Sequence, residues 1–170
     1  VLYKINNKFP ETLIVSNRPL KIQITKKITI IEDCFENLGP LVGVLSSMKW
    51  IKENKKTFKW IATFPSDTPF FETSIIEEYK KKITTNESSL YFVKSNNKRH
   101  NIFGLWSIDL LQTLENDIVK NNFRKVEDWA NKIGVKTINV EIKEFDPFFN
   151  INTKEDFEIA KKILNKNLND

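Results

Sequence analysis

The segment FPSDTPF, at residues 64–70, holds the carboxylate that is best placed to do chemistry, Asp67. Pro65 and Pro69 flank it. Each proline fixes its own φ angle and biases the preceding residue away from helix, so the backbone constrains where the carboxylate points. A single carboxylate held in this way suits Mg²⁺, which keeps several waters and takes further oxygens from a polyphosphate. The alternative is that Ser66 or Asp67 simply caps the turn or the next helix, and the local sequence leaves both interpretations open.

A second carboxylate, Asp33, ends the apolar run ITIIED at residues 28–33, and a short loop then leads to Gly39-Pro40 and a helix. Carboxylates at strand ends accept hydrogen bonds from nucleotide sugars in dinucleotide-binding folds, and a helix that begins with small residues can bind an anion. The alternative is an Asx turn that leads into the helix. Taken alone, the segment favours the turn.

Other common chemistries lack the residues that they need. The chain has one cysteine, Cys34, and one histidine, His100, so no internal disulfide framework and no zinc site built from several His and Cys ligands can form. We interpret His100 as a residue at the start of a strand with its ring in solvent. The chain has only four glycines, and they are too widely spaced to make a phosphate-cradling loop.

The net charge of +5 comes from 27 basic and 22 acidic residues, and only Arg18, Arg99 and Arg124 among the basic residues are arginine. The lysines are spread along the chain, which favours a solvated surface over a nucleic-acid binding patch. No apolar run approaches the length of about 18 residues that a membrane span needs, and the first residues do not resemble a signal peptide. We therefore expect a soluble, cytoplasmic protein that binds neither nucleic acid nor membrane.

Short apolar runs alternate with amphipathic stretches, which predicts an α/β protein with a mostly parallel sheet in a single domain of residues 1–170. In such sheets ligands bind beyond the C-terminal ends of the strands, where the polar segments described above lie. Strands are predicted at 12–17, 28–33, 58–64, 89–95, 101–107 and 135–142, with those at 89–95 and 101–107 adjacent and antiparallel. Helices are predicted at 39–54, 72–82, 108–120, 125–133 and 153–167.

In order and spacing, the segments IVSNR, IIED, GPLVGVLSSM, FPSDTPF, RHNIFGLW and FFNINTKEDF resemble those of the molybdenum cofactor guanylyltransferases. The resemblance runs from about Leu13 to the closing helix. Its most specific parts are the loop from Asp33 to Gly43, the turn at 66–69, and Asn-Ile-Asn-Thr at 150–153. It implies a Rossmann-like nucleotidyltransferase fold, a three-layer sandwich that transfers GMP from GTP to molybdenum-carrying molybdopterin with Mg²⁺ and releases pyrophosphate.

The resemblance also implies a role for particular residues. Asp67 matches the catalytic aspartate that binds Mg²⁺ and the nucleotide, and Asp33 matches an aspartate that contacts the guanine nucleotide. Asn101 stands where the family has a proline after its histidine. The other residues carried over are Ser16 and Asn17, in a base-recognition segment, and Asn150, Asn152 and His100, on the side of the molybdopterin acceptor.

Residues 1–12 depart from the family pattern. The family opens with a first strand and a Gly-Gly loop, which ends in Arg-Met-Gly and a lysine and wraps the triphosphate, and no such stretch is found here. Without it, backbone N–H groups and a lysine that balance developing charge are lacking, and so is a central strand of the sheet. We expect either a fragment of a longer protein or a degenerate paralogue.

Three other hypotheses remain beside guanylyl transfer. The first is a related nucleotidyltransferase that acts on CTP or on a sugar phosphate. The second is a non-catalytic module that binds molybdopterin or nucleotide, such as a partner for molybdenum cofactor delivery proteins. The third, nucleic-acid binding through the lysines, ranks last and predicts a steep dependence of binding on salt.

Overall fold

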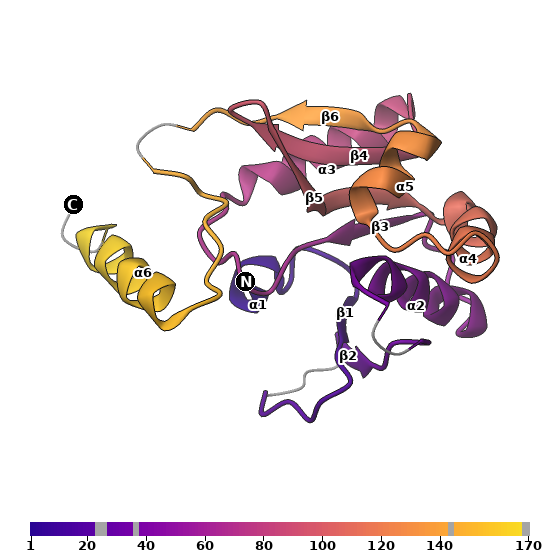
Figure 1. Ribbon diagram of the computed structural model, residues 1–170, viewed down its shortest axis with the longest axis horizontal. Coiled ribbons are helices and arrows are strands. Elements are labelled where there is room, and N and C mark those ends of the chain that lie inside the picture. Colours follow the sequence, from indigo (N-terminus) through magenta and orange to yellow (C-terminus); the bar gives the residue numbers. More distant parts are fainter. Residues whose placement is uncertain (23–26, 36–37, 143–144, 168–170) are drawn as a thin grey trace.

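The computed structural model describes residues 1–22, 27–35, 38–142 and 145–167 and confirms an α/β fold (Figure 1). The strands are β1 (Thr12–Val15), β2 (Ile28–Ile31), β3 (Trp60–Thr63), β4 (Leu90–Ser95), β5 (Lys98–Ser107) and β6 (Lys136–Asn139). The helices are α1 (Leu2–Ile5), α2 (Pro40–Glu53), α3 (Ser74–Thr85), α4 (Leu111–Val119), α5 (Val126–Ile133) and α6 (Lys154–Asn167), with a 3-10 turn, η1 (Ile108–Leu110), before α4.

The described strands divide between two sheets. One has four strands in the order β3-β5-β4-β6, and the other pairs β1 with β2 in parallel. In the larger sheet β5 is antiparallel to both β3 and β4, and β6 is parallel to β4. Therefore β3, β4 and β6 run in one direction and β5 alone opposes them, which keeps the carboxyl ends of three strands at a common edge.

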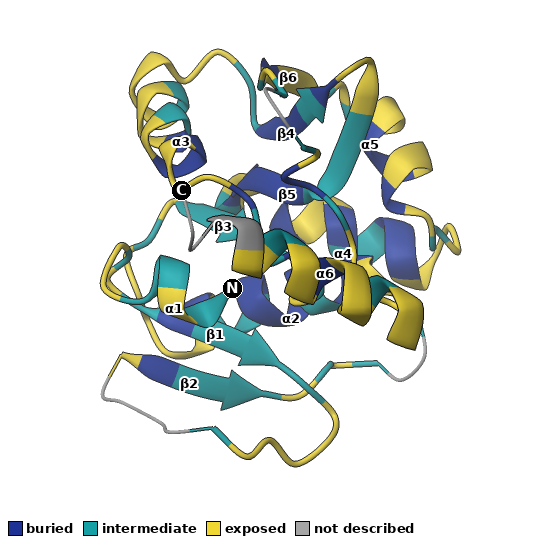
Figure 2. Ribbon diagram, turned by 90° about the vertical axis from the view of Figure 1, so that its left-hand side faces the viewer, coloured by how far each residue is buried: buried dark blue, intermediate teal, exposed yellow. Residues whose placement is uncertain are grey.

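Hydrophobic side chains cover both faces of the four-stranded sheet, as the alternation along β4 shows. Leu90 and Phe92 belong to a core shared with α2, α4 and α5, whereas Tyr91 and Val93 belong to a second core under α3. Because successive strand residues point to opposite faces, these two cores are separate layers. Figure 2 shows the contrast with β1 and β2, which are mainly half-buried.

The predicted hairpin of β4 and β5 is confirmed, but β5 begins at Lys98 rather than Asn101. Asn96 and Asn97 form the turn with φ angles of 43° and 62°. Asparagine tolerates this left-handed region better than most residues, so two of them side by side allow a tight hairpin connection. The segment NNKRH therefore supplies a two-residue turn and the start of a strand.

The ends of two predicted helices have the expected caps. Gly134 follows α5 with a φ of 84°, and its N–H donates to the carbonyl of Ala130 over 3.0 Å. At α6, Thr153 Oγ1 accepts from the N–H of Asp156 over 3.1 Å, and the Asp156 carboxylate accepts from the N–H of Thr153 over 2.9 Å. This reciprocal pair is a capping box.

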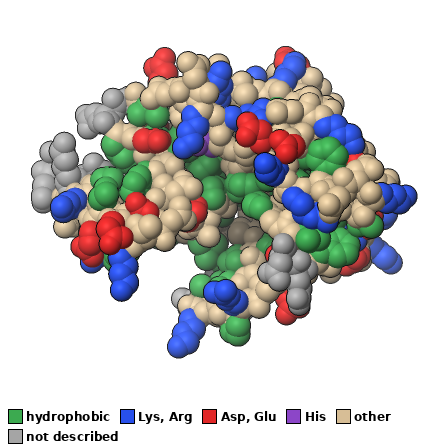
Figure 3. Space-filling view, viewed as in Figure 1, with side chains coloured by type: hydrophobic (Ala, Val, Ile, Leu, Met, Phe, Trp, Pro, Cys, Tyr) green, Lys and Arg blue, Asp and Glu red, His purple; other side chains and the backbone are tan. Residues whose placement is uncertain are grey.

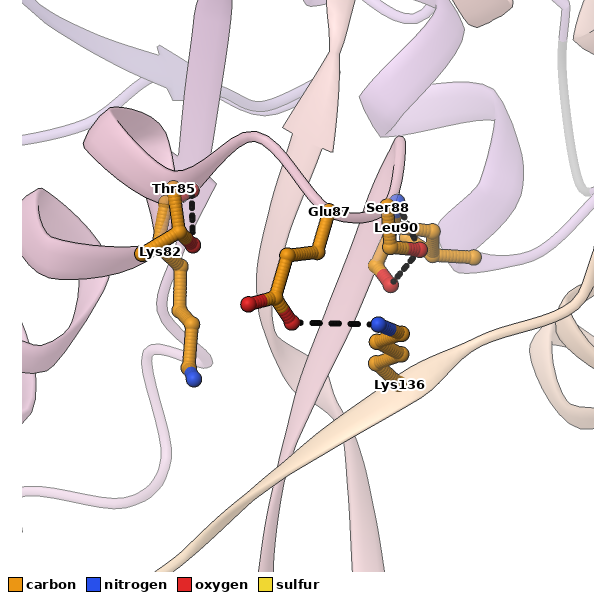
Figure 4. A network of polar contacts seen from close by, with 6 residues as sticks. All are labelled: Lys82, Thr85, Glu87, Ser88, Leu90 and Lys136. Carbon is orange, nitrogen blue, oxygen red and sulfur yellow. Dashed lines mark hydrogen bonds and ion pairs between the residues drawn. The ribbon is translucent and has the colours of Figure 1, made fainter.

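Polar contacts lie at the amino ends of β4 and β6, at the edge of the larger sheet opposite the predicted site (Figure 4). Lys136, the first residue of β6, donates to Glu87 over 3.1 Å. Ser88 Oγ bonds both the carbonyl and the N–H of Leu90, over 3.1 and 3.3 Å. These contacts fix where β4 begins and leave the carboxyl edge free for other residues.

Candidate functional site

Asp67 lies on a turn just after β3, as the sequence predicts, and its side chain is half-buried. The Thr68 hydroxyl, which is fully buried, lies 3.0 Å from Asp67 Oδ1 and 3.0 Å from Asn150 Oδ1. The N–H of Ile151 donates to the Asp67 carbonyl over 2.8 Å. Two segments about eighty residues apart in the chain therefore hold this carboxylate in place.

The structure also tests the simpler interpretation of the same turn. Helix α3 begins after Thr73, so neither Ser66 nor Asp67 caps it. Among the described residues no cation forms an ion pair with Asp67. The carboxylate is thus held by the Thr68 hydroxyl and by its turn, and no cation of the described residues compensates its charge, so a divalent cation could do so.

Asp33 and Asn17 lie together beyond the carboxyl ends of β2 and β1. The side-chain oxygen of Asn17 accepts a hydrogen bond from the N–H of Asp33 over 2.8 Å. Asp33 Oδ1 is shielded from solvent and takes no hydrogen bond from the described residues. Burial raises the pKa of Asp33 above its ordinary value, because the buried charge is poorly solvated. An acceptor oxygen in this state favours a ligand that brings a hydrogen-bond donor.

Ser16 has a different position from Asn17. Its hydroxyl donates to the carbonyl of Arg18 over 2.9 Å and accepts from the N–H of Arg18 over 3.2 Å. This local turn occupies the hydroxyl, whereas the amide of Asn17 is exposed beside Asp33. Of the two residues in the predicted base-recognition segment, the structure brings only Asn17 into contact with Asp33.

The interpretation of His100 as a ring in solvent is wrong. The ring stacks on Phe148 with centroids 4.0 Å apart, and its Nε2 lies 2.7 Å from Ser95 Oγ. Burial lowers the pKa of His100, the charge of Asp146 partly offsets this, and Lys98 lowers the pKa further. The error arose because strand position alone does not reveal a ring that arrives from a distant segment.

The other residues predicted to bind the acceptor, Asn150 and Asn152, differ in their side-chain contacts. Asn150 is joined to Asp67 through Thr68, but Asn152 is exposed, and only its backbone N–H bonds, to Asp156 over 3.1 Å. Sequence reasoning missed Thr68, Ser95 and Phe148. Thr68 could have been suspected from its place between Asp67 and a proline, whereas the other two need the fold.

A cavity of about 800 Å³ lies between the two sheets, and Asn17, Asp33 and Ser66 line it. Figure 3 shows the surface hollowed there, with hydrophobic side chains around the opening. The cavity therefore connects the Asp33 side of the molecule to the turn that carries Asp67. A ligand with a polar head and an extended body could touch both.

The described residues contain no group of three or more His, Cys, Asp or Glu side chains arranged to bind a metal ion. None of the helices within them has the length and hydrophobicity required to cross a bilayer. Any cation at Asp67 would thus take most of its ligands from water and substrate.

Residues 1–133 match the model of the MobA-like NTP transferase domain. The chain is 26% identical to a molybdenum cofactor guanylyltransferase of Nitrobacter hamburgensis over 80% of the chain and 66% of that protein. It is 30% identical to the enzyme of that name from Rhizobium rhizogenes over 75% of the chain and 61% of that protein. The chain thus spans less than two thirds of the length of either relative.

Solved structures show the same fold. Molybdopterin-guanine dinucleotide biosynthesis protein A of Archaeoglobus fulgidus superposes with a TM-score of 0.64 at 22% identity, over 81% of this chain and 68% of that one. The Rv0371c protein of Mycobacterium tuberculosis, solved in complex with manganese, gives a TM-score of 0.58 at 9% identity, over 82% and 69% of the two chains.

Proposed function

Because the chain belongs to the MobA-like NTP transferase family, we propose that it serves the transfer of GMP from GTP to molybdopterin. Its relatives carry the name of that activity. In this reaction an oxygen of the acceptor phosphate attacks the α-phosphorus of GTP, a new P–O bond forms, and the bond to pyrophosphate breaks. The attacking phosphate is already anionic, so no protein nucleophile is required.

The main support for this proposal is the contact of the buried Thr68 hydroxyl with the side chains of both Asp67 and Asn150. Asp67 would hold Mg²⁺, and the residues present fit that ion, because Mg²⁺ binds through one or two carboxylates together with waters and substrate phosphates. When bound, the ion supplies positive charge beside the phosphate oxygens. The Thr68 hydroxyl lies 3.0 Å from an oxygen of each side chain and can donate to either, so Asn150, which we assign to the acceptor, is held close to this carboxylate. GTP and the phosphate that accepts GMP could therefore be held at a fixed separation.

On the nucleotide side we assign Asp33 and Asn17 to the base or sugar. A carboxylate only accepts hydrogen bonds when ionised, and the N1–H and N2–H₂ edge of guanine offers two adjacent donors. Uracil offers one donor at its N3–H. Cytosine offers donors only at its N4–H₂ group. We assign guanine because both oxygens of one carboxylate could accept from its two adjacent donors, and the shielded Asp33 Oδ1 needs at least one such donor. Asn152 and His100 complete the proposed acceptor side.

Substitution of Asp67 tests the metal assignment. Calorimetric titration of GTP with and without Mg²⁺ should show a gain in affinity with the ion in the parent chain. Asp67→Asn keeps the size of the side chain but removes its charge, so this gain should fall at least about tenfold. Asp128→Asn, on the exposed face of α5, is the matched control and should keep the gain. If Asp67→Asn also keeps it, the assignment is wrong.

Titrations with GTP, CTP and UTP under the same conditions test the nucleotide assignment. GTP should bind most tightly, and Asp33→Asn should reduce its advantage over UTP by about tenfold, since one good hydrogen-bonded pair contributes about 1–3 kcal/mol. Equal affinities for the three nucleotides in the parent chain would contradict the role of Asp33 and leave that of Asp67 untouched.

A further inference from the structure

The segment 145–151, which carries Asn150, lies between β6 and α6 and forms neither strand nor helix. One buried ring attaches it to the larger sheet. Phe148 is 2% exposed, stacks on His100 with centroids 4.0 Å apart, and meets the ring of Phe103 edge-on at 5.1 Å. The position of the segment therefore depends on two rings of β5.

A local turn directs the Phe148 ring toward the sheet. Asp146 Oδ1 accepts a hydrogen bond from the N–H of Phe148 over 2.8 Å, and the carbonyl of Asp146 accepts from the N–H of Phe149 over 3.1 Å. Pro147, between them, has a fixed φ angle. Such an Asx turn holds the backbone at Phe148 in one conformation, so the ring enters the sheet at a defined place.

An irregularity in β5 brings both of its rings to Phe148. Val93 pairs with His100, whereas its neighbour Phe92 pairs with Gly104, so residues 101–103 have no pairing partner on β4. In a regular strand two residues that are three apart point to opposite faces. The unpaired residues interrupt this alternation, and His100 and Phe103 therefore both contact the ring of Phe148.

The His100 ring is also bound along one edge. Its Nε2 lies 2.7 Å from the hydroxyl oxygen of Ser95, a residue that is 3% exposed. One face of the ring thus lies on Phe148, and this nitrogen is engaged by a buried side chain. A ligand would have to break that contact to reach Nε2, so the geometry suits a residue that acts through its neighbours.

The segment reaches the Asp67 turn directly after Phe148. Asn150 Oδ1 lies 3.0 Å from the Thr68 hydroxyl, and the N–H of Ile151 donates to the Asp67 carbonyl over 2.8 Å. Only Phe149 separates Asn150 from the stacked ring. A displacement of Phe148 would therefore displace the Asn150 amide as well.

We propose that His100 is a positioning residue, whose ring holds residues 146–151 through Phe148 so that the Asn150 amide meets the Asp67 turn. That this amide contacts the acceptor rests on the proposed function. The mechanical link from His100 to Asn150 does not, because it is defined by contacts within the chain.

The link also depends on the charge of the ring. Asp146, from the segment, and Lys98, on β5, are the charged groups that act on it. Burial lowers the pKa of His100 more than Asp146 raises it, and Lys98 lowers it further. The stacked state therefore favours the neutral ring, and protonation favours release of Phe148.

Amide hydrogen exchange measured by NMR without nucleotide tests the link. Phe148→Leu keeps an apolar side chain but removes the stack, so exchange of the Ile151 N–H should become about tenfold faster, and the side-chain N–H₂ resonances of Asn150 should shift. The N–H of Asp33, on the β1–β2 unit, should keep its rate. Phe157→Leu, on the exposed face of α6, is the matched control and should change none of the three.

His100→Ala should speed exchange at Ile151 in the same way. Because both substitutions break one contact, the double variant should lie within about twofold of the faster single variant. In the parent chain the protection of Ile151, corrected for intrinsic exchange, should fall as the pH drops through the pKa of the His100 ring, measured from its own protons. His100→Ala should abolish this dependence.

If Phe148→Leu does not fold, as judged by circular dichroism, His100→Ala at its half-exposed position decides. Unchanged exchange at Ile151, unchanged Asn150 resonances, equal acceleration at Asp33, or multiplied effects in the double variant would each overturn the proposal. These measurements contain no nucleotide, so they can fail while the GTP titrations of the Asp67 variant succeed, and the reverse.

Discussion

The four-stranded sheet and the β1–β2 unit carry different parts of the candidate site and differ in how deeply their strands are buried. Five of the six residues of β4 are buried, whereas β1 and β2 each bury one. The residues predicted to bind the acceptor thus lie beside a sheet with packed cores on both faces, and Asp33 and Asn17 follow a pair of strands that no other described strand extends. Asp67 is therefore supported by a well-packed sheet, whereas Asp33 and Asn17 are supported by two strands that are mainly half-buried.

The largest expected difference between the two regions is in the cost of removing a large side chain. Trp106 is fully buried, contacts the rings of Phe92 and Trp129, and donates to Thr63 Oγ1 over 2.8 Å. Trp106→Ala should lower the free energy of unfolding by about 3–5 kcal/mol. Ile14→Ala in β1 should cost only about 1 kcal/mol, because one side of Ile14 already faces the cavity.

Urea denaturation followed by circular dichroism would measure both changes. Equal losses in the free energy of unfolding would contradict the expected difference, since they would mean that the β1–β2 unit packs as tightly in solution as the larger sheet does. A two-step transition, with the β1–β2 unit unfolding first, would show that this unit is the less stable of the two.

Two glycines provide a smaller and more local test. A Cβ on Gly104 would lie 2.6 Å from Trp106 Nε1 and 2.9 Å from two atoms of Phe92, whereas one on Gly43 would lie 3.6 Å from Asp33 Oδ1. Gly104→Ala should therefore destabilise by about 1–3 kcal/mol through overpacking. Gly43→Ala should be neutral or stabilise by up to about 1 kcal/mol, because alanine favours the helix.

Thermal unfolding of the two variants gives the readout, with the parent chain as reference. The opposite ranking, with Gly43→Ala the more harmful, would show that α2 packs on β1 more closely than the structure has it.

The smallest expected effect is the dependence of stability on pH that comes from His100, on β5 of the larger sheet. Burial lowers the pKa of His100, so near and below pH ~6.5 the unfolded chain binds more protons than the folded one. The contribution of the neutral ring is therefore complete above the unfolded pKa and is lost as the pH falls toward the folded pKa. Because the ring is half-exposed, the loss should stay below about 1 kcal/mol.

His100→Gln should make the free energy of unfolding depend less on pH between pH 7 and pH 5. Because His100 is the only histidine of the chain, the difference can be attributed to it directly. NMR titration of the ring protons gives its pKa independently. A value above 6.5 would contradict the burial of the ring and reverse the sign of the pH effect.

The sequence predicted local features well because short-range chemistry determines them. The strand at Thr12–Val15, the glycine after α5 and the capping box at Thr153 all depend on neighbours within a few residues. The position of Asp67 past a strand end followed from its flanking prolines in the same way.

Contacts between distant segments were not predictable from local pattern. Thr68 meets Asn150 across 82 residues of chain, and the ring of His100 meets Phe148 from a loop far along the sequence. The start of β5 was placed three residues late because asparagine pairs in a turn look like an ordinary polar linker. Each of these misses required knowledge of which elements pack together, and a single sequence does not supply it.

The hydroxyl of Thr68 has one proton and two oxygens competing for it, on Asp67 and on Asn150. A cation that neutralises the Asp67 carboxylate would weaken that carboxylate as an acceptor, so the Thr68 O–H would donate to Asn150 instead. The buried threonine would then fix the orientation of the Asn150 amide whenever a cation is bound at Asp67, which couples two segments that are 82 residues apart in the chain.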